Sequence, residues 1–387
     1  MPWSETTPMR ERFLFVAEAQ EDFFSIAELC ERHGISRKTG YKFLERFEWE
    51  GPAGLVDRLR APHSSPYRTA PEVTERVLEF RRRHPSWGPK KLIRLLRDSD
   101  PQTIWPAPST AGDLLTRAGL VQARRRPRRP PLPGPTQLSR PVHPNDLWSA
   151  DFKGQFKTGD GVYCYPLTIA DGASRFLLEV RALLSTDCPP VRQSFEQLFR
   201  QYGLPQAIRT DNGTPFAGTG LYRLSRLSVW WTRLGIQHQR IAPSHPEQNG
   251  SHERMHKTLK EETTRPPQTN RKSQQRRFDR FRHEYNQLRP HEALGQRTPA
   301  SLYRPSPRPY SSRLPQPEYP GHFELRRVGS NGCILWKQHP LFLSHTLAGE
   351  LVGLEEVNDG IWSLHFGPLL LARLDQRTGK LHEGIPR

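Results

Sequence analysis

Two patterns of hydrophobic positions divide the chain. Up to about residue 120, apolar residues recur every three or four positions, as on one face of an amphipathic helix. Ile26, Leu29 and Cys30 form one such stripe, and Val73 and Val77 belong to another. From about residue 145, short runs rich in strand-forming residues alternate with turn residues. The pattern therefore predicts all-α N-terminal domains followed by domains that contain sheets.

The segment 8–48 predicts short helices joined by a turn. Gly34 lies in the turn, and Ser36 is placed to cap a second helix. The apolar positions of that helix are predicted to be Tyr41, Leu44 and Phe47. This is the helix-turn-helix pattern, in which the N-terminal residues of the second helix lead into the major groove. The candidate DNA contacts are Arg37, Lys38 and Thr39; the alternative is a plain helical hairpin with a solvated basic face.

The segment 71–120 predicts a second helix-turn-helix domain. Pro89 stands near the start of one helix. Ser109 is interpreted as the N-cap of a later helix that ends on Gly119. The candidate DNA contacts are Lys90, Lys91, Ser109 and Thr110, although the lysines fit a solvated face equally well.

A basic, proline-rich linker is predicted over 121–144. It should be extended rather than packed, so that its arginines could follow a phosphate backbone. These arginines are Arg124, Arg125, Arg126, Arg128 and Arg129. The whole chain of 387 residues has 58 Lys and Arg against 40 Asp and Glu, a formal net charge of +18. Such a charge predicts a polyanionic partner, with nucleic acid first.

The four cysteines are scattered without a C-x-x-C pair, so neither a cysteine zinc site nor a disulfide framework is predicted. No apolar run approaches the length of a membrane span, and the N-terminus lacks a signal-peptide pattern. We therefore expect no membrane partner. The expected location is cytoplasmic and nucleoid-associated, in a bacterium.

Three further domains are predicted after the linker. Residues 145–265 show three strand-like runs and then alternating helices and strands, which is typical of an α/β domain with a mixed sheet. One of its helices is expected over "LYRLSRLSVWWTRLG". Residues 266–317 predict a helix and a linker. Residues 318–383 contain four or five short strands with recurrent turn signals, which favour a small β-barrel.

Two aspartates of the α/β domain are candidate metal ligands. Asp151 lies in an apolar predicted strand, where a carboxylate is costly unless it is paired or binds a metal. Asp211 ends the predicted strand "QAIRTD" and precedes a tight turn. Two Mg²⁺ ions can clamp the attacking and leaving oxygens of an in-line phosphoryl displacement, and they need oxygen ligands. A third carboxylate is therefore wanted, from Glu247 or Glu253.

Local structure favours Glu253 over Glu247. Glu247 follows a proline inside the loop-like "PSHPEQNG", whereas Glu253 stands in the first turn of a predicted helix, which fixes its direction. The same helix carries Lys257 and Lys260 at i+4 and i+7. Their charges suit a phosphate substrate. Met255 and Leu259 are predicted to form its buried side.

The stretches "TDNGTPF" and "HPEQNGSHERMHKTLK" resemble the catalytic core of retroviral integrases and of bacterial insertion-sequence transposases. Residue by residue, the resemblance assigns Asp151, Asp211 and Glu253 as catalytic residues and metal ligands. The stretches "GLVDRLRAPHSSP", "HPSWGPKKL" and "YNQLRPHEALGQRTPASLY" are similar to the flanks of transposases of the four-eight-one family of insertion sequences.

The resemblance implies a DNA transposase with a ribonuclease H-like core. Such an enzyme uses two Mg²⁺ per site, which Mn²⁺ replaces, to expose a 3′-OH at each element end and join it to target DNA. Joining two ends implies a homo-oligomer, at least a dimer. Candidate DNA contacts near the site are Lys153, Arg209, Asn212, Lys257 and Lys260, and Asp171 is interpreted as a turn cap. The alternatives are a DNA-binding regulator with an inactive core and a ribonuclease H-type nuclease.

Overall fold

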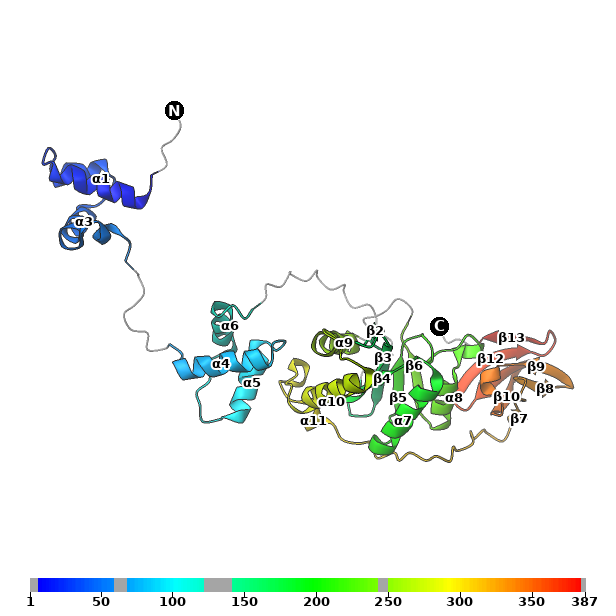
Figure 1. Cartoon of the computed structure of the whole chain (residues 1–387). Helices are drawn as coiled ribbons and strands as arrows, with labels where there is room; N and C mark the ends of the chain where they lie inside the picture. The colour runs from blue at the N-terminus through cyan, green and yellow to red at the C-terminus, as the bar shows by residue number, and fades with distance from the viewer. Residues whose placement is uncertain (1–5, 59–67, 122–140, 243–249, 384–387) are drawn as a thin grey trace. The chain divides into compact units, whose positions relative to one another are not determined.

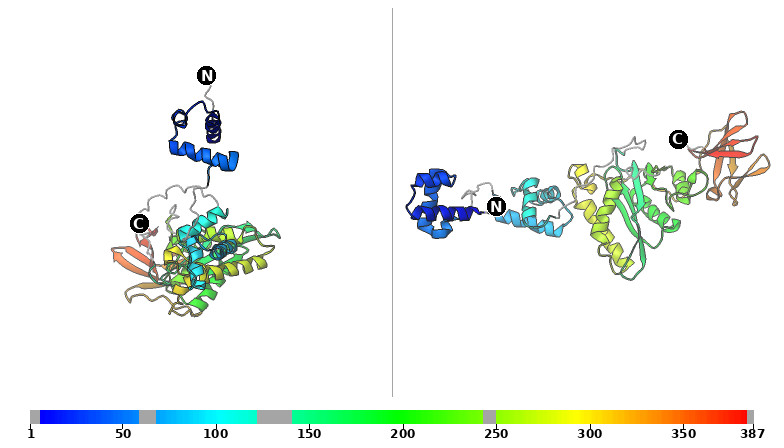
Figure 2. Two further views of the ribbon diagram at one scale, coloured as in Figure 1. Left: turned by 90° about the vertical axis from the view of Figure 1, so that its left-hand side faces the viewer. Right: turned by 90° about the horizontal axis from the view of Figure 1, so that it is seen from above.

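The computed structural model describes residues 6–58, 68–121, 141–242 and 250–383. The chain divides into two compact units, Met1–Thr69 and Ala70–Arg387. Figure 1 and Figure 2 show the helices of the first unit in dark blue, and the helices and sheets of the second in the remaining colours.

The first unit is a small helical domain. Its helices are α1 (Pro8–Gln20), α2 (Ile26–Arg32) and α3 (Arg37–Glu50), followed by a 3₁₀ turn at Gly51–Leu55. The expected cap is confirmed, because the Ser36 side chain accepts a hydrogen bond from the backbone N–H of Thr39. The core contains Phe15, Val16, Leu29, Cys30, Phe43 and Leu55.

The apolar stripe predicted for α3 was wrong at its first member. Tyr41 is 59% exposed, and Gly40 and Phe43 face the core in its place. The stripe begins one residue earlier because Gly40 lacks a side chain and lets α3 approach Phe15 and Cys30 closely. Leu44 and Phe47 pack against the same core, as predicted.

Three helices begin the second unit: α4 (Pro71–Arg83), α5 (Pro89–Ser99) and α6 (Pro108–Arg117). They bury Val77, Trp87, Leu92, Ile93, Leu96, Trp105, Ala111 and Leu115. The N-cap prediction for Ser109 was wrong. The helix begins at Pro108, with Ala107 as its N-cap, because proline is favoured in the first turn, where its missing N–H costs no hydrogen bond. Ser109 and Thr110 remain exposed in that first turn.

A mixed sheet forms the centre of the second unit. Its strands are β1 (Leu147–Phe152), β2 (Phe156–Lys157), β3 (Tyr163–Asp171), β4 (Leu177–Leu183), β5 (Ala207–Thr210) and β6 (Gln237–Arg240). Strands β4, β3 and β1 pair antiparallel in that order, and β5 and β6 continue the sheet parallel to β1. Short β2 pairs with the free end of β3. This strand order is that of a ribonuclease H-like core.

Helices cover the two faces of this sheet. Alternate side chains of a strand point to opposite faces. Trp148 and Ala150 of β1 therefore pack with α7 (Cys188–Tyr202) and α8 (Arg226–Arg233). The other face packs against α9 (Gly250–Thr263) and α10 (Arg271–Gln287). The long helix expected over "LYRLSRLSVWWTRLG" is interrupted, because Tyr222 has a left-handed φ of 52° and Ser225 caps a new start at Arg226.

The C-terminal sheet is open, so the predicted small barrel was wrong. After a 3₁₀ turn (Glu292–Leu294) and α11 (Pro299–Leu302), five strands follow in the order β13-β12-β11-β10-β7. These are β7 (Glu324–Arg327), β10 (Leu351–Asn358), β11 (Ile361–Phe366), β12 (Leu369–Asp375) and β13 (Lys380–Glu383), and β8 (Cys333–Trp336) and β9 (His339–Phe342) form a separate hairpin. The C-terminal sheet need not close into a barrel to bury its apolar face, because Leu224 and Val229 of the central domain pack into the core of that sheet.

No helix in the described part of the chain is long and apolar enough to cross a membrane. All four cysteines are free, and Cys30 and Cys164 are buried.

Candidate metal centre and DNA-binding surfaces

Asp151 lies in β1, and Asp211 directly follows the adjacent parallel strand β5. Strands β1 and β5 pair Leu147 with Ala207 and Ser149 with Arg209, an offset of 60 residues (207 − 147). The same offset separates Asp211 from Asp151 (211 − 151), so continuing this register past the end of β5 brings the two residues to the same level. Because Ala150 belongs to the core on the α7 side, Asp151 points to the α9 side.

Glu253 stands in the first turn of α9, as predicted. Its side chain is exposed together with Lys257 and Lys260, while Met255 and Leu259 are buried against the sheet. Anchoring by these two apolar side chains fixes the direction in which Glu253 projects. Glu247 lies outside the described residues.

The charges of Asp211 and Glu253 both act on Asp151. Burial raises the pKa of Asp151 to about 7, and the negative charges of Asp211 and Glu253 add to the rise, while a backbone hydrogen bond from Phe152 and the charge of Lys153 oppose it. Burial also raises the pKa of Asp211. A partly buried aspartate that feels two further carboxylate charges favours a bound cation, and an all-oxygen donor set suits Mg²⁺. These residues therefore fit a divalent metal.

The loop after β5 is braced by hydrogen bonds. Gly213 donates its backbone N–H to Asp211 Oδ1 at 3.2 Å, and the Asn212 side chain donates to the Ile241 carbonyl at 2.8 Å. Asn212 thus ties this loop to the end of β6, in addition to any contact with DNA. Arg209 is buried and donates to Gln239, so the prediction that it contacts DNA was wrong: β5 places it inside the sheet.

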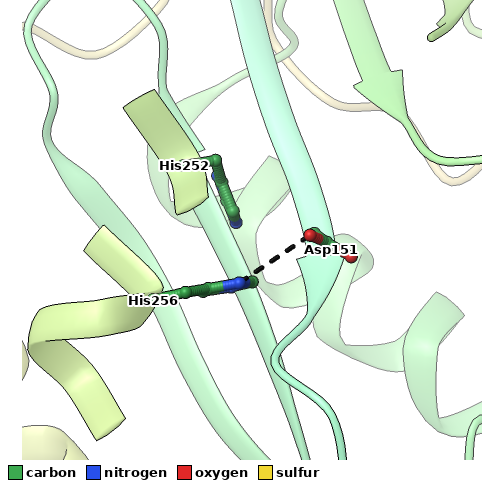
Figure 3. Close-up of side chains that lie close together, drawn as sticks. All are labelled: Asp151, His252 and His256. Carbon is green, nitrogen blue, oxygen red and sulfur yellow. Dashed lines mark ion pairs between the residues drawn. The ribbon is translucent and has the colours of Figure 1, made fainter. Parts of the chain in front are cut away.

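Three residues that the sequence did not single out lie beside Asp151. His252 and His256 project from the buried face of α9 towards β1, as Figure 3 shows. The Nε2 atoms of both rings lie 2.7 and 2.6 Å from the hydroxyl of Thr168, which is the direct cross-strand neighbour of Asp151. Burial lowers the pKa of His252 to about 3 and that of His256 to about 2, so both rings are neutral.

A sequence signal for the two histidines existed. They flank Glu253 in the order H-E-R-M-H, and histidines at i and i+4 lie on one face of a helix, a spacing that is typical of metal-binding helices. The Asp151 carboxylate completes a group of three side chains whose ligand atoms lie within 4.8 Å of one another. Thr168 had no such signal, because only the pairing of β1 with β3 places it there.

Asp171 is a turn cap, as the sequence predicted. Its carboxylate accepts hydrogen bonds from the backbone N–H of Asn145 at 2.7 Å and from the N–H and hydroxyl of Ser174 at 2.8 and 2.6 Å. The side chain is buried in the turn between β3 and β4.

Lys90 and Lys91 lie where the first turn of α5 meets the central domain. Lys90 pairs with Glu292 at 2.8 Å. Lys91 is half-buried, and burial together with the charge of Arg289 lowers the pKa of Lys91 to about 8. These contacts favour a role in holding α5 against the central domain over the DNA contact considered for both lysines.

The other candidate DNA contacts are exposed where they are described. Arg37 and Lys38 are exposed at the start of α3, and Thr39 is partly exposed there. Lys153 is partly exposed immediately after β1. The linker arginines Arg124, Arg125, Arg126, Arg128 and Arg129 lie outside the described residues.

Family comparisons match most of these domains. Two models described as "Integrase core domain" match residues 141–246 and 234–299. A "Helix-turn-helix domain" model matches residues 11–63, and a "Homeodomain-like domain" model matches residues 39–115.

Curated relatives come from insertion elements and retroviruses. The chain is 29% identical over 255 residues to the uncharacterized 39.2 kDa protein of insertion element IS476 from Xanthomonas euvesicatoria, covering 65% of this chain and 70% of that protein. It is 28% identical to the uncharacterized 31.7 kDa protein of IS407 from Burkholderia multivorans, covering 49% of this chain and 66% of that protein. The match to the Gag-Pol polyprotein of feline leukemia virus is 29% identical but spans only 7% of the polyprotein and 34% of this chain.

Solved structures of viral integrases are also similar. The HTLV-2 integrase catalytic core domain in complex with magnesium is 18% identical, with a TM-score of 0.32, over 43% of this chain and 100% of that chain. The simian T-cell lymphotropic virus intasome chain is 17% identical, with a TM-score of 0.37, over 73% of this chain and 93% of that chain.

Proposed function

We propose that this chain is a DNA transposase, related to the proteins of insertion elements and to retroviral integrases, that cuts element ends and joins them to target DNA. One observation carries the proposal. Asp151, Asp211 and Glu253 come from three separate elements, and the charges of the other two help to raise the pKa of Asp151. Such a cluster suits metal-assisted phosphoryl transfer on a phosphodiester.

The carboxylates of Asp151, Asp211 and Glu253 would hold two Mg²⁺ ions, with Mn²⁺ as a substitute. When bound, such a pair activates the attacking oxygen and stabilises the leaving oxygen of an in-line displacement. The protein's own contribution is to fix the direction of its ligands. The paired strands hold the two aspartates, and the buried side of α9 holds Glu253. No side-chain nucleophile is required.

Lys257 and Lys260 would bind phosphates beside the metal ligands. Both are exposed on α9 together with Glu253. Lys153 follows Asp151 directly and adds positive charge at the same place. Positive charge there would offset the repulsion between the DNA backbone and the three carboxylates.

The helical domains would bind the terminal inverted repeats of the element. The first turn of α3 presents Arg37, Lys38 and Thr39, and the first turn of α6 presents Ser109 and Thr110. Short polar and cationic residues at the start of a helix suit contacts with base edges and phosphates in the major groove. Because two element ends must be joined together, we propose at least a dimer, acting on DNA in the bacterial nucleoid.

Strand transfer tests this function. The purified full chain would be incubated with Mg²⁺, supercoiled plasmid and a pre-nicked duplex taken from the DNA that flanks the gene. We expect joined product from the wild type and a loss of at least about 10³-fold from Asp151→Asn, Asp211→Asn and Glu253→Gln. Glu261→Gln, an exposed glutamate of the same helix, is the matched control and should retain activity.

The other outcomes distinguish the alternatives. A dead Glu247→Gln beside an active Glu253→Gln would move the third ligand into the loop before α9. A wild type that binds the end duplex but never joins it would favour the regulator. Cleavage of an RNA–DNA hybrid without strand transfer would favour the ribonuclease H-type nuclease.

A further inference from the structure

The two histidines of α9 converge on a single hydroxyl. His252 and His256 lie four residues apart on the buried face of the helix, 3% and 6% exposed, and their ring centroids are 4.6 Å apart. Both Nε2 atoms contact Thr168 Oγ1. In a zinc site of this H-E-x-x-H spacing, the metal would occupy the point where the rings converge. Here the Thr168 hydroxyl occupies it.

The hydrogen bonds at Thr168 favour one tautomer for both rings. The hydroxyl has one proton, and it also lies 3.0 Å from the backbone carbonyl of Asp151, which can only accept. If the hydroxyl donates to that carbonyl, it must accept from both imidazoles, so each ring carries its proton on Nε2. All three contacts are then satisfied with one proton each.

This tautomer leaves Nδ1 of His256 with a free lone pair. That atom lies 3.7 Å from Asp151 Oδ2, the contact drawn as a dashed line in Figure 3. The distance is too long for a hydrogen bond, and both atoms are acceptors when Asp151 is ionised. Two acceptors that face each other in a buried site suit a cation between them.

We propose that His256 Nδ1 is a nitrogen ligand of the divalent cation held by Asp151, and that Thr168 and His252 orient this ring. The inference rests on the proposed function, because it adds a ligand to the same site. Metal-binding histidines commonly donate their other ring nitrogen to a neighbouring acceptor, which fixes the tautomer, and Thr168 supplies that acceptor.

A nitrogen ligand changes the metal preference of the site. Mg²⁺ favours carboxylate, carbonyl and water oxygens, whereas imidazole suits the first-row transition metals. Three carboxylates alone would leave the site close to a pure Mg²⁺ site. With His256 as a ligand, the site binds Mn²⁺ more tightly than Mg²⁺, and the ratio of the two affinities depends on the His256 ring.

Pulsed electron paramagnetic resonance of bound Mn²⁺ tests the inference without any mutation. The full chain would be loaded with Mn²⁺ in two forms, with natural-abundance histidine and with ¹⁵N-histidine. We expect ¹⁴N modulation of the Mn²⁺ signal from a directly bound nitrogen, replaced by the ¹⁵N pattern in the labelled protein. Mn²⁺ bound by oxygen ligands alone, with no nitrogen coupling, would overturn the inference.

Variants then identify the histidine. His256→Gln should lose the nitrogen coupling and weaken Mn²⁺ binding about 10- to 100-fold, with a smaller loss for Mg²⁺. His252→Gln, which alters the other ring on the same hydroxyl, is the matched control and should keep the coupling. Thr168→Val keeps the shape of the side chain and removes the hydroxyl, so it should weaken Mn²⁺ binding without removing a ligand. Thermal unfolding of each metal-free variant shows that the domain is folded.

The failure of this inference and that of the proposed function are distinguishable. Mn²⁺ binding that disappears in Asp151→Asn but lacks nitrogen coupling would overturn only the role of His256. Coupling that survives His256→Gln and disappears in His252→Gln would transfer the role to the other ring and overturn the assignment. Mn²⁺ binding unchanged in Asp151→Asn would remove the metal ligands of the proposed function as well.

Discussion

Asp151 in β1 and Asp211, which directly follows the adjacent parallel strand β5, are 60 positions apart in the chain, the same offset as the paired residues of the two strands. Burial is the main cause of the raised pKa of Asp151, and the charge of Asp211 is the next. The closeness of the two carboxylates is therefore a property that can be measured apart from catalysis.

Asp211→Asn should lower the pKa of Asp151 from about 7, because it removes a like charge that disfavours ionisation. Burial remains, so the pKa should stay above the usual value of an aspartate. The measurement is a pH titration of ¹³C-carboxyl-labelled aspartate by NMR in the metal-free chain. Asp359→Asn, a highly exposed aspartate of the C-terminal sheet, is the control and should leave the titration unchanged. An unchanged pKa in Asp211→Asn would mean that the two carboxylates are not neighbours.

Asp171→Asn should destabilise the fold and leave the strand-transfer activity of the folded protein unchanged. An amide would turn an NH₂ group towards the N–H and hydroxyl donors of Asn145 and Ser174, and losing buried hydrogen bonds of this kind costs about 1–3 kcal/mol. Thermal unfolding should show a lower midpoint, while strand transfer per folded molecule stays near that of the wild type at 25 °C. An Asp171→Asn chain of normal stability that cannot join DNA would place Asp171 in the catalytic machinery.

The sequence predicted most of the central fold because its signals there are local. The strand runs, Asp211 at a strand end and the position of Glu253 in the first turn of a helix all follow from the pattern of neighbouring residues. The cap at Ser36 followed from the same kind of local signal. The placement of Asp171 in a turn was equally local.

Several of the differences between prediction and structure depended on tertiary packing. The open C-terminal sheet depends on Leu224 and Val229, which come from the central domain and could not be assigned to that core from strand patterns. The buried position of Arg209 depends on the neighbouring strands of β5. Thr168 lies beside Asp151 because β1 pairs with β3, and it contacts His252 and His256 of α9, which are over 80 residues away in the chain.

Gly40→Ala should destabilise the N-terminal domain. Alanine normally stabilises a helix relative to glycine by about 1 kcal/mol, but a Cβ at Gly40 would lie 2.6 Å from Cys30 Sγ and 2.9 Å from Phe15. Overpacking of this kind costs about 1–3 kcal/mol, so the net effect should be a loss of stability and of DNA binding.

Gly112→Ala is the matched control for Gly40→Ala. Gly112 lies inside α6, and its added Cβ would meet Pro89 at 3.5 Å, an ordinary van der Waals distance. This variant should be more stable than the wild type by up to about 1 kcal/mol. Calorimetry of both variants gives the comparison, and a stable Gly40→Ala would show that α3 does not approach α1 and α2 as closely as described.

Lys91→Met should remove a pH-dependent part of the stability of the second unit. Lys91 has a pKa of about 8 in the folded chain, because burial and the charge of Arg289 outweigh the attraction of Glu262 and Glu292. An unfolded chain keeps this lysine protonated up to its ordinary pKa near 10.5. Between pH 8 and 10.5 the unfolded state therefore binds more protons, so this group makes the fold more stable as pH rises.

The comparison of Lys91→Met with Lys90→Met isolates that contribution. Lys90 is exposed and pairs with Glu292, which raises the pKa of Lys90, so its removal should not reproduce the effect. Denaturant unfolding from pH 7 to 10 should show that the free energy of unfolding of the wild type increases relative to that of Lys91→Met as pH rises. The gain should stay well below about 1.4 kcal/mol per pH unit, because Lys91 is partly exposed to solvent. Parallel stability curves for the wild type and Lys91→Met would show that α5 does not bury this lysine against the central domain.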